Sequence, residues 1–442
     1  MKFLTSVYDR LRRYREERAF AALGRSTYAA SRSSAIVGSE PVVTVNFLCE
    51  EFFHPDLRGY GGFGLTVKNI AEHFNAAEEA PYRVRLAFPQ GTQLVRAPEV
   101  RRFHETDVIL RPATPRTHVP SFTGYHHLLN RQGRQVFLSI DWYPSYLYPL
   151  HALSATPLII WIHDPRDRDE WQRIGQVPGE LEFRGLRHPH ELHGLADEKA
   201  SSMRRLFNLQ KSCPRMIAFA TTAMTLLERA RATYQLPDLQ AHWLPNPIAL
   251  PDVPSIEYSE KPTLLYLGRL DPVKRPWIVF ELARRHPGID FVIAGQSHAP
   301  DLFRQWKERY DGLPNLKLLG HVDAVEKDRL LRSCWGILNT SVHEAEPVSF
   351  LEAFSYGKCV VSCHDPDQEV SRFGYFVGEV NGEGLDEDSL RRFGDGINQL
   401  VSRADQRLEK GTAGMAEMKK HHTFKRFEER LSEIIEIERL HR

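Results

Sequence analysis

Short runs of apolar, β-branched residues recur along this chain, and stretches with helical periodicity separate them. The runs lie at residues 41–48, 84–88, 136–140, 158–162, 216–220, 263–267, 290–294, 316–318, 335–339 and 359–362. This alternation predicts βαβ units, and hence parallel strands that are buried on both faces. A segment with four prolines, at 245–254, divides the series and cannot form the interior of a helix. The sequence therefore predicts an α/β protein with two parallel-sheet domains, whose ligands bind in a cleft at the carboxyl ends of the strands.

Size and composition agree with two large domains. The chain has 442 residues, and a domain typically has about 150. Hydrophobic residues make up 42%, enough for sizeable cores, and the net charge of +1 argues against a nucleic-acid-binding protein. No apolar run approaches the ~18 residues of a membrane span. The five cysteines are scattered, which fits a reducing compartment, so we expect a cytoplasmic protein without a disulfide framework.

The amino-terminal segment differs in composition from the rest. Residues 1–33 carry eight Lys/Arg and three Asp/Glu, a local excess of 8 − 3 = 5 positive charges, and their apolar residues recur at helical spacing. A basic amphipathic helix of this kind can lie peripherally on the inner face of an anionic membrane, or it can pack on its own protein. We predict an extension at 1–40, domains at 41–248 and 249–424, and a helix at 425–442 that packs back on the first domain.

Two glutamates, Glu344 and Glu352, precede the predicted strand at 359–362. Gly357 is a helix stop, which places Glu352 in the first turns of a short helix and Glu344 in the loop before it. The amino end of a helix suits a phosphate, and carboxylates beside it can accept hydrogen bonds from sugar hydroxyls. The alternative is structural, because Ser349 and Glu352 match a capping box.

Two cations follow the predicted strand at 263–267. Arg269 and Lys274 flank a tight turn at Asp271. The carboxyl end of a parallel strand is where a ligand lies, and two cations there could neutralise a diphosphate. The alternative is a solvated loop that carries charges without a ligand.

A glycine-rich loop lies between the first predicted strand and its helix. Gly59, Gly61 and Gly64 match the G-x-G-x-x-G fingerprint of dinucleotide-binding proteins. The loop begins well after the strand, however, and no acidic residue directly follows the next strand, which disfavours a nicotinamide or flavin dinucleotide. The glycines, with Gly62 among them, would still let backbone amides approach a phosphate or a sugar closely.

Histidines and paired aspartates complete the candidate set. His163 follows the predicted strand at 158–162, where it could donate or accept at a substrate hydroxyl, although a lone histidine is often structural. Three histidines at 188–193 flank a proline, which predicts a loop on the acceptor side. Aspartate triplets occur at 167–169 and 365–367, but neither is clearly placed to hold a divalent ion at a diphosphate, so we predict no metal site.

Taken in order, these segments resemble the family-4 retaining glycosyltransferases of the GT-B fold. The resemblance covers about residues 42–440, and its most specific part is the pair Glu344 and Glu352 with the continuation through Gly357. The sequence departs from the family pattern at Ala345, where glycine is common, and at Glu346, where an apolar residue is common.

The resemblance implies two Rossmann-like domains that face an interdomain cleft, and a role for each candidate residue. Arg269 and Lys274 would hold the diphosphate of the donor. Glu344 would bind hydroxyls of the transferred sugar, Glu352 would bind the ribose, and His163 would sit beside the sugar. The remaining donor contacts would come from Gly61, Gly62, Pro347, Val348, Ser349 and Phe350.

The implied reaction is transfer of a sugar, with retention and without a metal or other cofactor, from a UDP- or GDP-linked donor to an acceptor hydroxyl. The acceptor would be a carbohydrate, a lipid-linked molecule or a small molecule, as in carbohydrate biosynthesis, and no nucleic acid would take part. Two alternatives stay open: a nucleotide-sugar epimerase on the same fold, and a nucleotide-sugar-binding protein without turnover. The sequence does not identify the sugar, the acceptor or the linkage.

Overall fold

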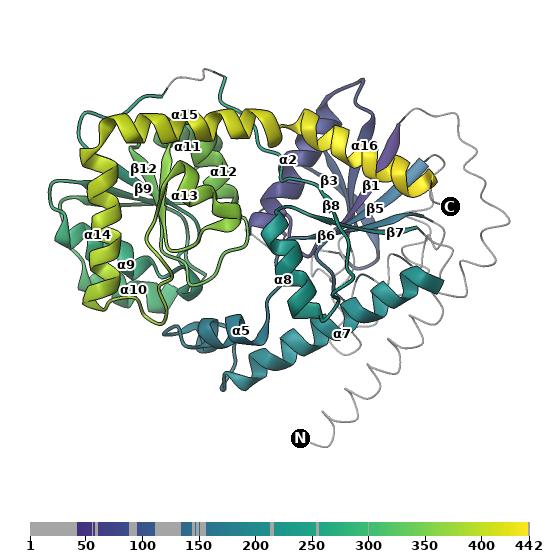
Figure 1. The fold of residues 1–442 in the computed structure, drawn as a ribbon, viewed down its shortest axis with the longest axis horizontal. Helices are drawn as coiled ribbons and strands as arrows, with labels where there is room; N and C mark the ends of the chain where they lie inside the picture. The colour runs from purple at the N-terminus through teal and green to yellow at the C-terminus, as the bar shows by residue number, and fades with distance from the viewer. Residues whose placement is uncertain are drawn as a thin grey trace.

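The computed structural model describes residues 42–54, 56–57, 61–87, 95–110, 134–143, 146, 150, 156–212, 216–252, 256–298 and 300–440. Two parallel sheets, each flanked by helices, form two lobes that lie side by side (Figure 1). The basic extension predicted at 1–40 lies outside the described residues. Within the described part of the chain, no helix combines the length and the apolar character needed to cross a bilayer.

The first sheet has the strand order β3-β4-β2-β1-β5-β6-β7-β8, and among its described pairings only that of β3 with β4 is antiparallel. Its strands are β1 (Val43–Leu48), β2 (Tyr82–Ala87), β3 (Glu99–Phe103), β4 (Thr106–Leu110), β5 (Arg134–Ile140), β6 (Leu158–Ile162), β7 (Ile217–Thr221) and β8 (His242–Trp243). Every residue of β6 and β7 is buried, as expected for central parallel strands covered on both faces.

The second sheet has the order β11-β10-β9-β12-β13-β14, and all its described pairings are parallel. Its strands are β9 (Thr263–Leu267), β10 (Asp290–Ala294), β11 (Leu316–Gly320), β12 (Gly336–Asn339), β13 (Cys359–Ser362) and β14 (Tyr375–Phe376). This is the 3-2-1-4-5-6 order of a Rossmann fold, which places the topological switch point between β9 and β12. The prediction of an α/β protein with two Rossmann-like domains is confirmed.

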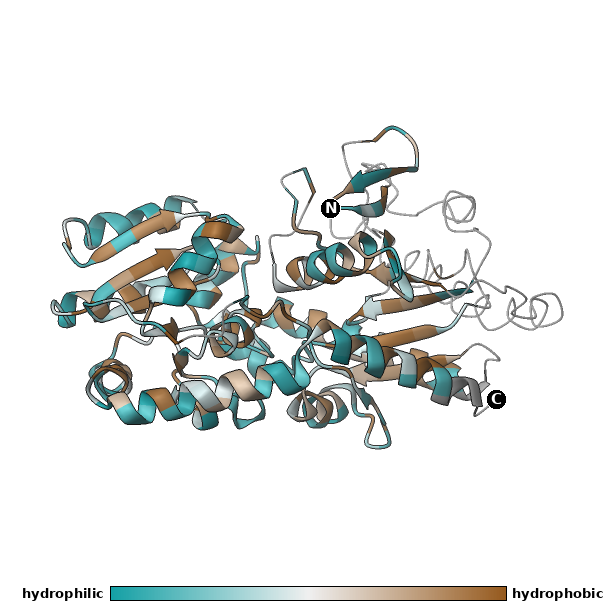
Figure 2. Cartoon of the chain, turned by 90° about the horizontal axis from the view of Figure 1, so that it is seen from above, coloured by the Kyte–Doolittle hydropathy of each residue, from teal (hydrophilic) through white to brown (hydrophobic). Residues whose placement is uncertain are grey.

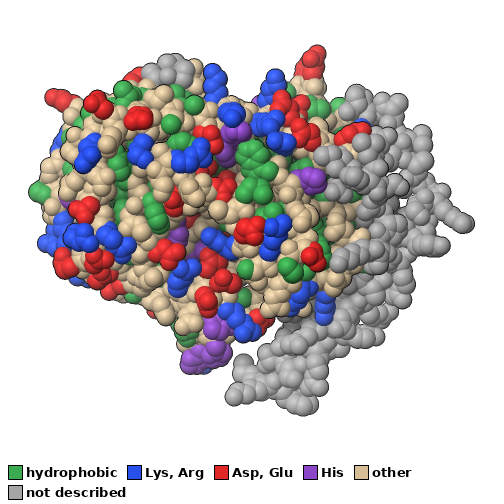
Figure 3. Space-filling view, in the orientation of Figure 1, with side chains coloured by type: hydrophobic (Ala, Val, Ile, Leu, Met, Phe, Trp, Pro, Cys, Tyr) green, Lys and Arg blue, Asp and Glu red, His purple; other side chains and the backbone are tan. Residues whose placement is uncertain are grey.

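Helices cover both sheets, and Figure 2 shows the hydrophobic strands enclosed by helices that are hydrophilic on their outer sides. On the first domain these are α2 (Gly62–Ala76), α5 (Arg168–Gly175), α6 (Glu180–Phe183), α7 (His190–Ser212) and α8 (Met224–Tyr234). The second domain carries α9 (Pro276–Arg285), α10 (Pro300–Arg309), α11 (Ala324–Ser333), α12 (Val348–Ser355), α13 (Glu369–Phe373), α14 (Glu387–Ser402), α15 (Ala404–His421) and then α16 (Phe424–Leu440). Figure 3 shows acidic and basic side chains intermixed over one face of the molecule, in line with the net charge of +1.

Two segments cross between the lobes. Helix α16 leaves the second domain and lies over the first (Figure 1), where Phe427 and Leu431 share a buried cluster with Phe74 and Trp161. In the opposite sense, Ile174 and the residues around it pack into the core of the second domain, although the chain there belongs to the first. The lobes are therefore held by packing as well as by the linker. The domain bounds at 248 and 424 stay a prediction.

The prediction of a loop at 188–193 is wrong, because α7 begins at His190. Pro189 lies just before the helix, a position that needs no backbone N–H. The carboxylate of Glu191 accepts hydrogen bonds from the backbone N–H of Arg187, at 2.9 Å, and of His188, at 2.8 Å, which stabilises the turn that leads into the helix.

Candidate active site

The switch point of the second sheet brings Lys274 and Glu344 together. Lys274 follows β9, Glu344 follows β12, and the ammonium Nζ lies 2.6 Å from Glu344 Oε1. The same oxygen accepts hydrogen bonds from Asn339 Nδ2 at 2.9 Å and from Ser341 Oγ at 2.5 Å. Burial opposes ionisation, but the attraction of Lys274 and these hydrogen bonds outweigh it and lower the pKa of Glu344 to about 2. Glu344 is therefore an ionised acceptor at neutral pH.

The arrangement of Lys274 and Glu344 depends on Arg275, a residue that was not predicted from the sequence. Arg275 has a left-handed backbone with φ of 48° and a fully buried side chain. Its guanidinium donates to the carbonyls of Thr340 at 2.7 Å, Ser341 at 2.9 Å and Val380 at 2.8 Å. Because it joins the loops after β9 and β12, Arg275 fixes the distance between Lys274 and Glu344.

Arg269 is the more accessible of the two predicted cations. Its side chain is 37% exposed, and its guanidinium lies 3.1 Å from the carboxylate of Asp271, which is fully buried. The hydroxyl of Tyr266 donates to the carbonyl of Arg269 at 2.8 Å and holds the backbone at the end of β9. The backbone of Arg269 is therefore held in place while its side chain stays partly exposed.

Helix α12 begins at Val348, four residues after Glu344. The N-cap residue is Pro347, which offers no side-chain hydrogen bond, so the capping box predicted as the structural alternative for Ser349 and Glu352 is wrong. Glu352 lies one turn further along, and its carboxylate is 2.5 Å from Lys327 Nζ on α11. The first N–H groups of α12 thus lack a side-chain cap, and such groups can bind an anion.

The four residues at the start of α12 differ in exposure. Pro347, Val348 and Ser349 are half-buried, so their backbone can reach a ligand. Phe350 is fully buried and packs against Phe354, with ring centroids 6.4 Å apart. Phe350 therefore offers a ligand no exposed surface in this structure.

On the first domain, Gly61 and Gly62 form the start of α2. A Cβ atom at Gly61 would lie only 2.1 Å from Glu51 Oε2, so a side chain does not fit there without movement of Glu51. The same oxygen accepts a hydrogen bond from Gly64 N at 3.4 Å. The position where a phosphate would lie at this helix end is thus taken by a carboxylate of the chain itself.

His163 lies next to this helix end. Its ring packs edge-on against Phe63 and Trp161, with centroids 5.3 Å and 4.3 Å away. Burial lowers the pKa of His163 to about 4, so the ring is neutral at neutral pH. Its Nε2 is buried and has no hydrogen-bond partner among the residues that the structure describes. His163 can therefore donate or accept one hydrogen bond.

A direct contact links the two halves of the site. Asp164, which follows His163, accepts a hydrogen bond at 2.8 Å from Nε2 of His343, which precedes Glu344. The other ring nitrogen of His343 lies 3.3 Å from the carboxylate of Glu170. This contact was not predicted, although the dipeptides His163–Asp164 and His343–Glu344 both follow buried strands. The contact brings the two predicted catalytic residues to one junction between the domains.

In both aspartate triplets, carboxylates accept hydrogen bonds from backbone N–H groups. Asp167 caps α5 through its bond to Glu170 N at 2.8 Å. Asp365 accepts from Val370 N at 2.8 Å at the start of α13. Asp367 accepts from two backbone N–H groups at the start of α8, both at 2.8 Å. Within the described residues one other group could hold a metal, namely Glu346, Glu369 and His422.

A cavity of about 330 Å³ lies between α5, α7 and α8, and none of the predicted site residues line it.

Comparisons with known proteins identify the fold. Residues 253–411 match the family model described as glycosyl transferases group 1, and this span contains Arg269, Lys274, Glu344 and Glu352. No curated protein matches the chain. Sucrose-phosphate synthase from Thermosynechococcus elongatus is 13% identical with a TM-score of 0.64, over 89% of this chain and 98% of its own.

Two further solved structures are similar over nearly their whole length. Anabaena HepE in complex with UDP and glucose is 13% identical with a TM-score of 0.59, over 89% of this chain and 99% of its own. The chain has the GT-B fold. WaaG, a glycosyltransferase involved in lipopolysaccharide biosynthesis, is 12% identical with a TM-score of 0.54, over 87% and 98%. Sequence identities of 12–13% establish the shared fold and do not by themselves establish a shared activity.

Proposed function

We propose that this GT-B protein is a retaining glycosyltransferase that moves a sugar from a nucleotide diphosphate-sugar to an acceptor hydroxyl without a metal. The observation that carries the proposal is the group of charged residues at the switch point of the second sheet. There the Lys274–Glu344 pair lies beside the uncapped start of α12. Cations and free N–H groups suit a diphosphate, and an ionised carboxylate suits sugar hydroxyls.

The departing diphosphate would be bound by Lys274, Arg269 and the first N–H groups of α12. Negative charge grows on it as the glycosidic bond breaks, so these groups would stabilise the transition state more than the bound substrate. In the free protein each cation is paired with a carboxylate, Lys274 with Glu344 and Arg269 with Asp271. The diphosphate would share these cations, which supply the charge that a metal provides in other enzymes.

The transferred sugar would lie between Glu344 and His163. Glu344 is ionised and so only accepts hydrogen bonds, whereas the neutral ring of His163 can donate one from Nε2. The Asp164–His343 hydrogen bond keeps the two residues at one junction. Closure of the domains on the sugar would exclude water, which competes with the acceptor. The proton of the acceptor would pass to the departing phosphate, so a strong base on the protein is not required.

The test has two stages. Thermal shift with UDP-, GDP- and ADP-sugars identifies the donor, because a ligand that binds the folded state raises its stability. UDP-glucose is the first to try, since the HepE structures hold UDP, glucose and UDP-glucose. Release of nucleotide is then measured with and without candidate acceptors. Release that depends on the acceptor, with the anomeric configuration kept, supports the proposal.

Other outcomes identify the alternatives. Conversion of the donor to an epimer without nucleotide release would indicate an epimerase. Donor binding with no conversion, across a broad set of acceptors, would indicate a nucleotide-sugar-binding protein.

A further inference from the structure

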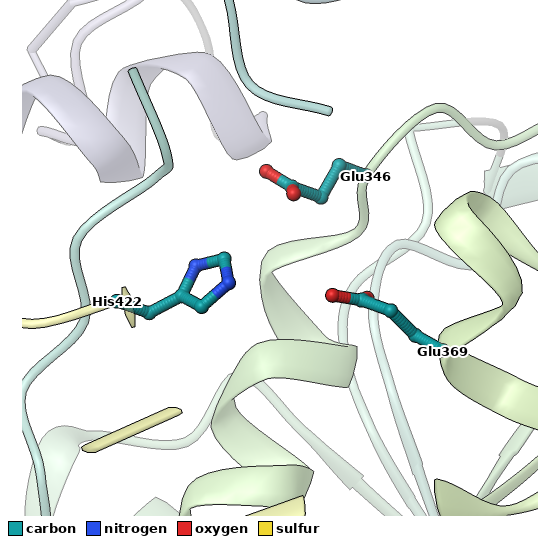
Figure 4. Close-up of side chains that lie close together, drawn as sticks. All are labelled: Glu346, Glu369 and His422. Atoms are coloured by element: carbon teal, nitrogen blue, oxygen red, sulfur yellow. The ribbon is translucent and has the colours of Figure 1, made fainter. Parts of the chain in front are cut away.

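Three potential metal ligands converge at the junction of the two domains. They are Glu346, in the loop before α12, Glu369, the first residue of α13, and His422, which follows α15. One ligand atom from each lies within 4.8 Å of the others. Figure 4 shows the two carboxylates and the imidazole directed toward a common centre. Glu346 is also the acid that departs from the glycosyltransferase pattern.

One of the two carboxylates in this group, that of Glu369, is not fully satisfied by the protein. Glu369 is only 6% exposed, and its Oε2 has no hydrogen-bond partner within the described residues. Arg372, a cation that acts on Glu369, is itself paired with Glu417 at 3.2 Å. A buried carboxylate oxygen without a partner is costly, so the group is short of positive charge.

His422 is held in the form that binds metals. It is 4% exposed, and its Nδ1 lies 3.0 Å from the carbonyl oxygen of Asn246, to which it can donate. This leaves the lone pair on Nε2, the ring nitrogen on the side of Glu369 in Figure 4. The side chain of the same Asn246 donates to Glu346 Oε2 at 2.6 Å. Asn246 therefore orients two of the three ligands, as groups behind metal ligands commonly do.

We propose that Glu346, Glu369 and His422 bind one divalent transition-metal ion, for which Zn²⁺ is the best match. Two carboxylates and one imidazole are a common donor set for zinc, and a water would complete four-fold coordination. Zinc–ligand distances of about 2.0–2.2 Å require ligand atoms about 3.5 Å apart, so the side chains close by about 1 Å on binding. The +2 charge offsets the two carboxylates.

The ion would fix the relative orientation of the domains. It would join the loop before α12, the start of α13 and the junction between α15 and α16. Asn246, which hydrogen-bonds to two of the ligands, would connect it to the interdomain linker. Asp367, two residues before Glu369, already ties α13 to the start of α8 in the first domain. The site is separate from the Lys274–Glu344 pair, so this proposal does not rest on the proposed reaction.

The first experiment uses the full chain after treatment with a chelator. Titration with ZnCl₂ at pH 7.5, followed by calorimetry, should show one equivalent bound with micromolar or tighter affinity. Metal analysis after dialysis should find one zinc per chain. A hundredfold excess over Kd should raise the melting temperature by several degrees. MgCl₂, which prefers six oxygen ligands, should bind at least tenfold more weakly.

Two adjacent histidines provide a matched pair of variants. His422→Gln should lower zinc affinity by about a hundredfold or more, whereas His421→Gln should retain it, because His421 packs on Trp243 instead. Glu369→Gln is a second variant that should lose binding. The proposal is overturned if the wild-type chain binds no stoichiometric zinc, or if His422→Gln and Glu369→Gln bind it as tightly as the wild type. Should the variants fail to fold, the wild-type titration and metal analysis decide alone.

Discussion

Glu344 and Glu346 lie two residues apart on one loop, and both are half-buried, yet their surroundings are opposite. Glu344 faces the ammonium of Lys274 and two hydrogen-bond donors, and its pKa falls to about 2 despite burial. Burial raises the pKa of Glu346 to about 8, and the nearby Asp367 adds to the shift, while Asn246 opposes it. A neighbouring positive charge, rather than the degree of burial, therefore decides which of the two carboxyl groups is ionised at neutral pH.

The two glutamates of this loop therefore suit different ligands. The side of Glu344 already holds the cations that a diphosphate needs, so a donor can bind there without a further ion. The side of Glu346 holds acids in excess, so a proton or a metal ion is needed to offset them. The predictions below test whether the two sides act independently.

The largest effect is expected from Lys274→Ala. Loss of a preorganised cation beside the departing diphosphate should lower turnover at saturating donor about a hundredfold, or ~3 kcal/mol. Steady-state kinetics measures this, with circular dichroism to verify the fold. Lys261→Ala is the matched control, because Lys261 precedes the amino end of the same strand, at the opposite edge of the sheet. Equal turnover in the two variants would remove the loop after β9 from the active site.

The second prediction concerns pH and Glu346. In a chelator, the folded state holds the proton of Glu346 up to about pH 8, whereas the unfolded chain releases it near its usual value of 4.5. The stabilising contribution is therefore complete below about pH 4.5 and is lost as the pH rises through about 8. Glu346→Gln, which has no proton to lose, should therefore gain stability relative to the wild type as the pH rises from 4.5 to 8.5, as measured by urea denaturation.

Glu344 provides the contrast in the same experiment. Because its folded pKa lies below the unfolded value, its contribution is present above about pH 4.5 and is lost as the pH falls through about 2. Glu344→Gln should therefore leave the pH dependence between 6 and 8.5 unchanged. If both variants alter that range equally, the two acids are coupled and the comparison fails.

The third prediction separates donor affinity from transfer. Glu352→Gln should weaken binding of the nucleoside diphosphate about tenfold, or ~1.4 kcal/mol, because an amide accepts the ribose hydroxyls less strongly than a carboxylate. Glu344→Gln should mainly lower turnover. Isothermal calorimetry measures the affinities. Glu326→Gln is the control, since Glu326 lies on α11 beside Lys327 and pairs with the exposed Arg329. Unchanged affinity in Glu352→Gln would exclude Glu352 from the donor site.

The smallest effect is expected from EDTA. Turnover at 25 °C should change less than twofold, since Arg269, Lys274 and α12 supply the charge at the diphosphate. The melting temperature should nevertheless fall, because the proposed ion at Glu346, Glu369 and His422 is removed. Parallel assays and melts on one sample measure both. Loss of turnover that manganese or magnesium restores would contradict the metal-free mechanism.

Short-range patterns in the sequence were enough to predict most of the fold. Strands β6, β9, β10 and β13 have the predicted bounds, because each is a short apolar run that both faces of a sheet bury. Strand β3 was missed, since its sequence Glu99–Phe103 is charged and lies at the edge of the sheet, where one side needs no apolar residues. The start of α7 was missed because Pro189 resembles a loop residue when read alone.

The sequence predicted those features of the candidate site that depend on neighbouring residues in the chain. It did not predict contacts between distant segments. The sequence placed Glu352 on a helix, but not beside Lys327, which lies 25 residues earlier in the chain. The contact between Asp164 and His343 spans 179 residues and two domains, so it depends on how the lobes pack. Glu346 was recognised as unusual, but Glu369 and His422 come from other segments and no spacing links them to it.

The return of α16 to the first lobe has a consequence during synthesis. The core that contains Phe74 and Trp161 is completed by Phe427 and Leu431, which the ribosome adds after the whole second domain. From Asn246 to Phe424 is 424 − 246 = 178 residues, or roughly 10 to 35 seconds of translation. Throughout that interval the nascent first domain presents an uncovered apolar face, so its core is completed only after the second domain has been synthesised, and a chaperone has a defined surface to protect.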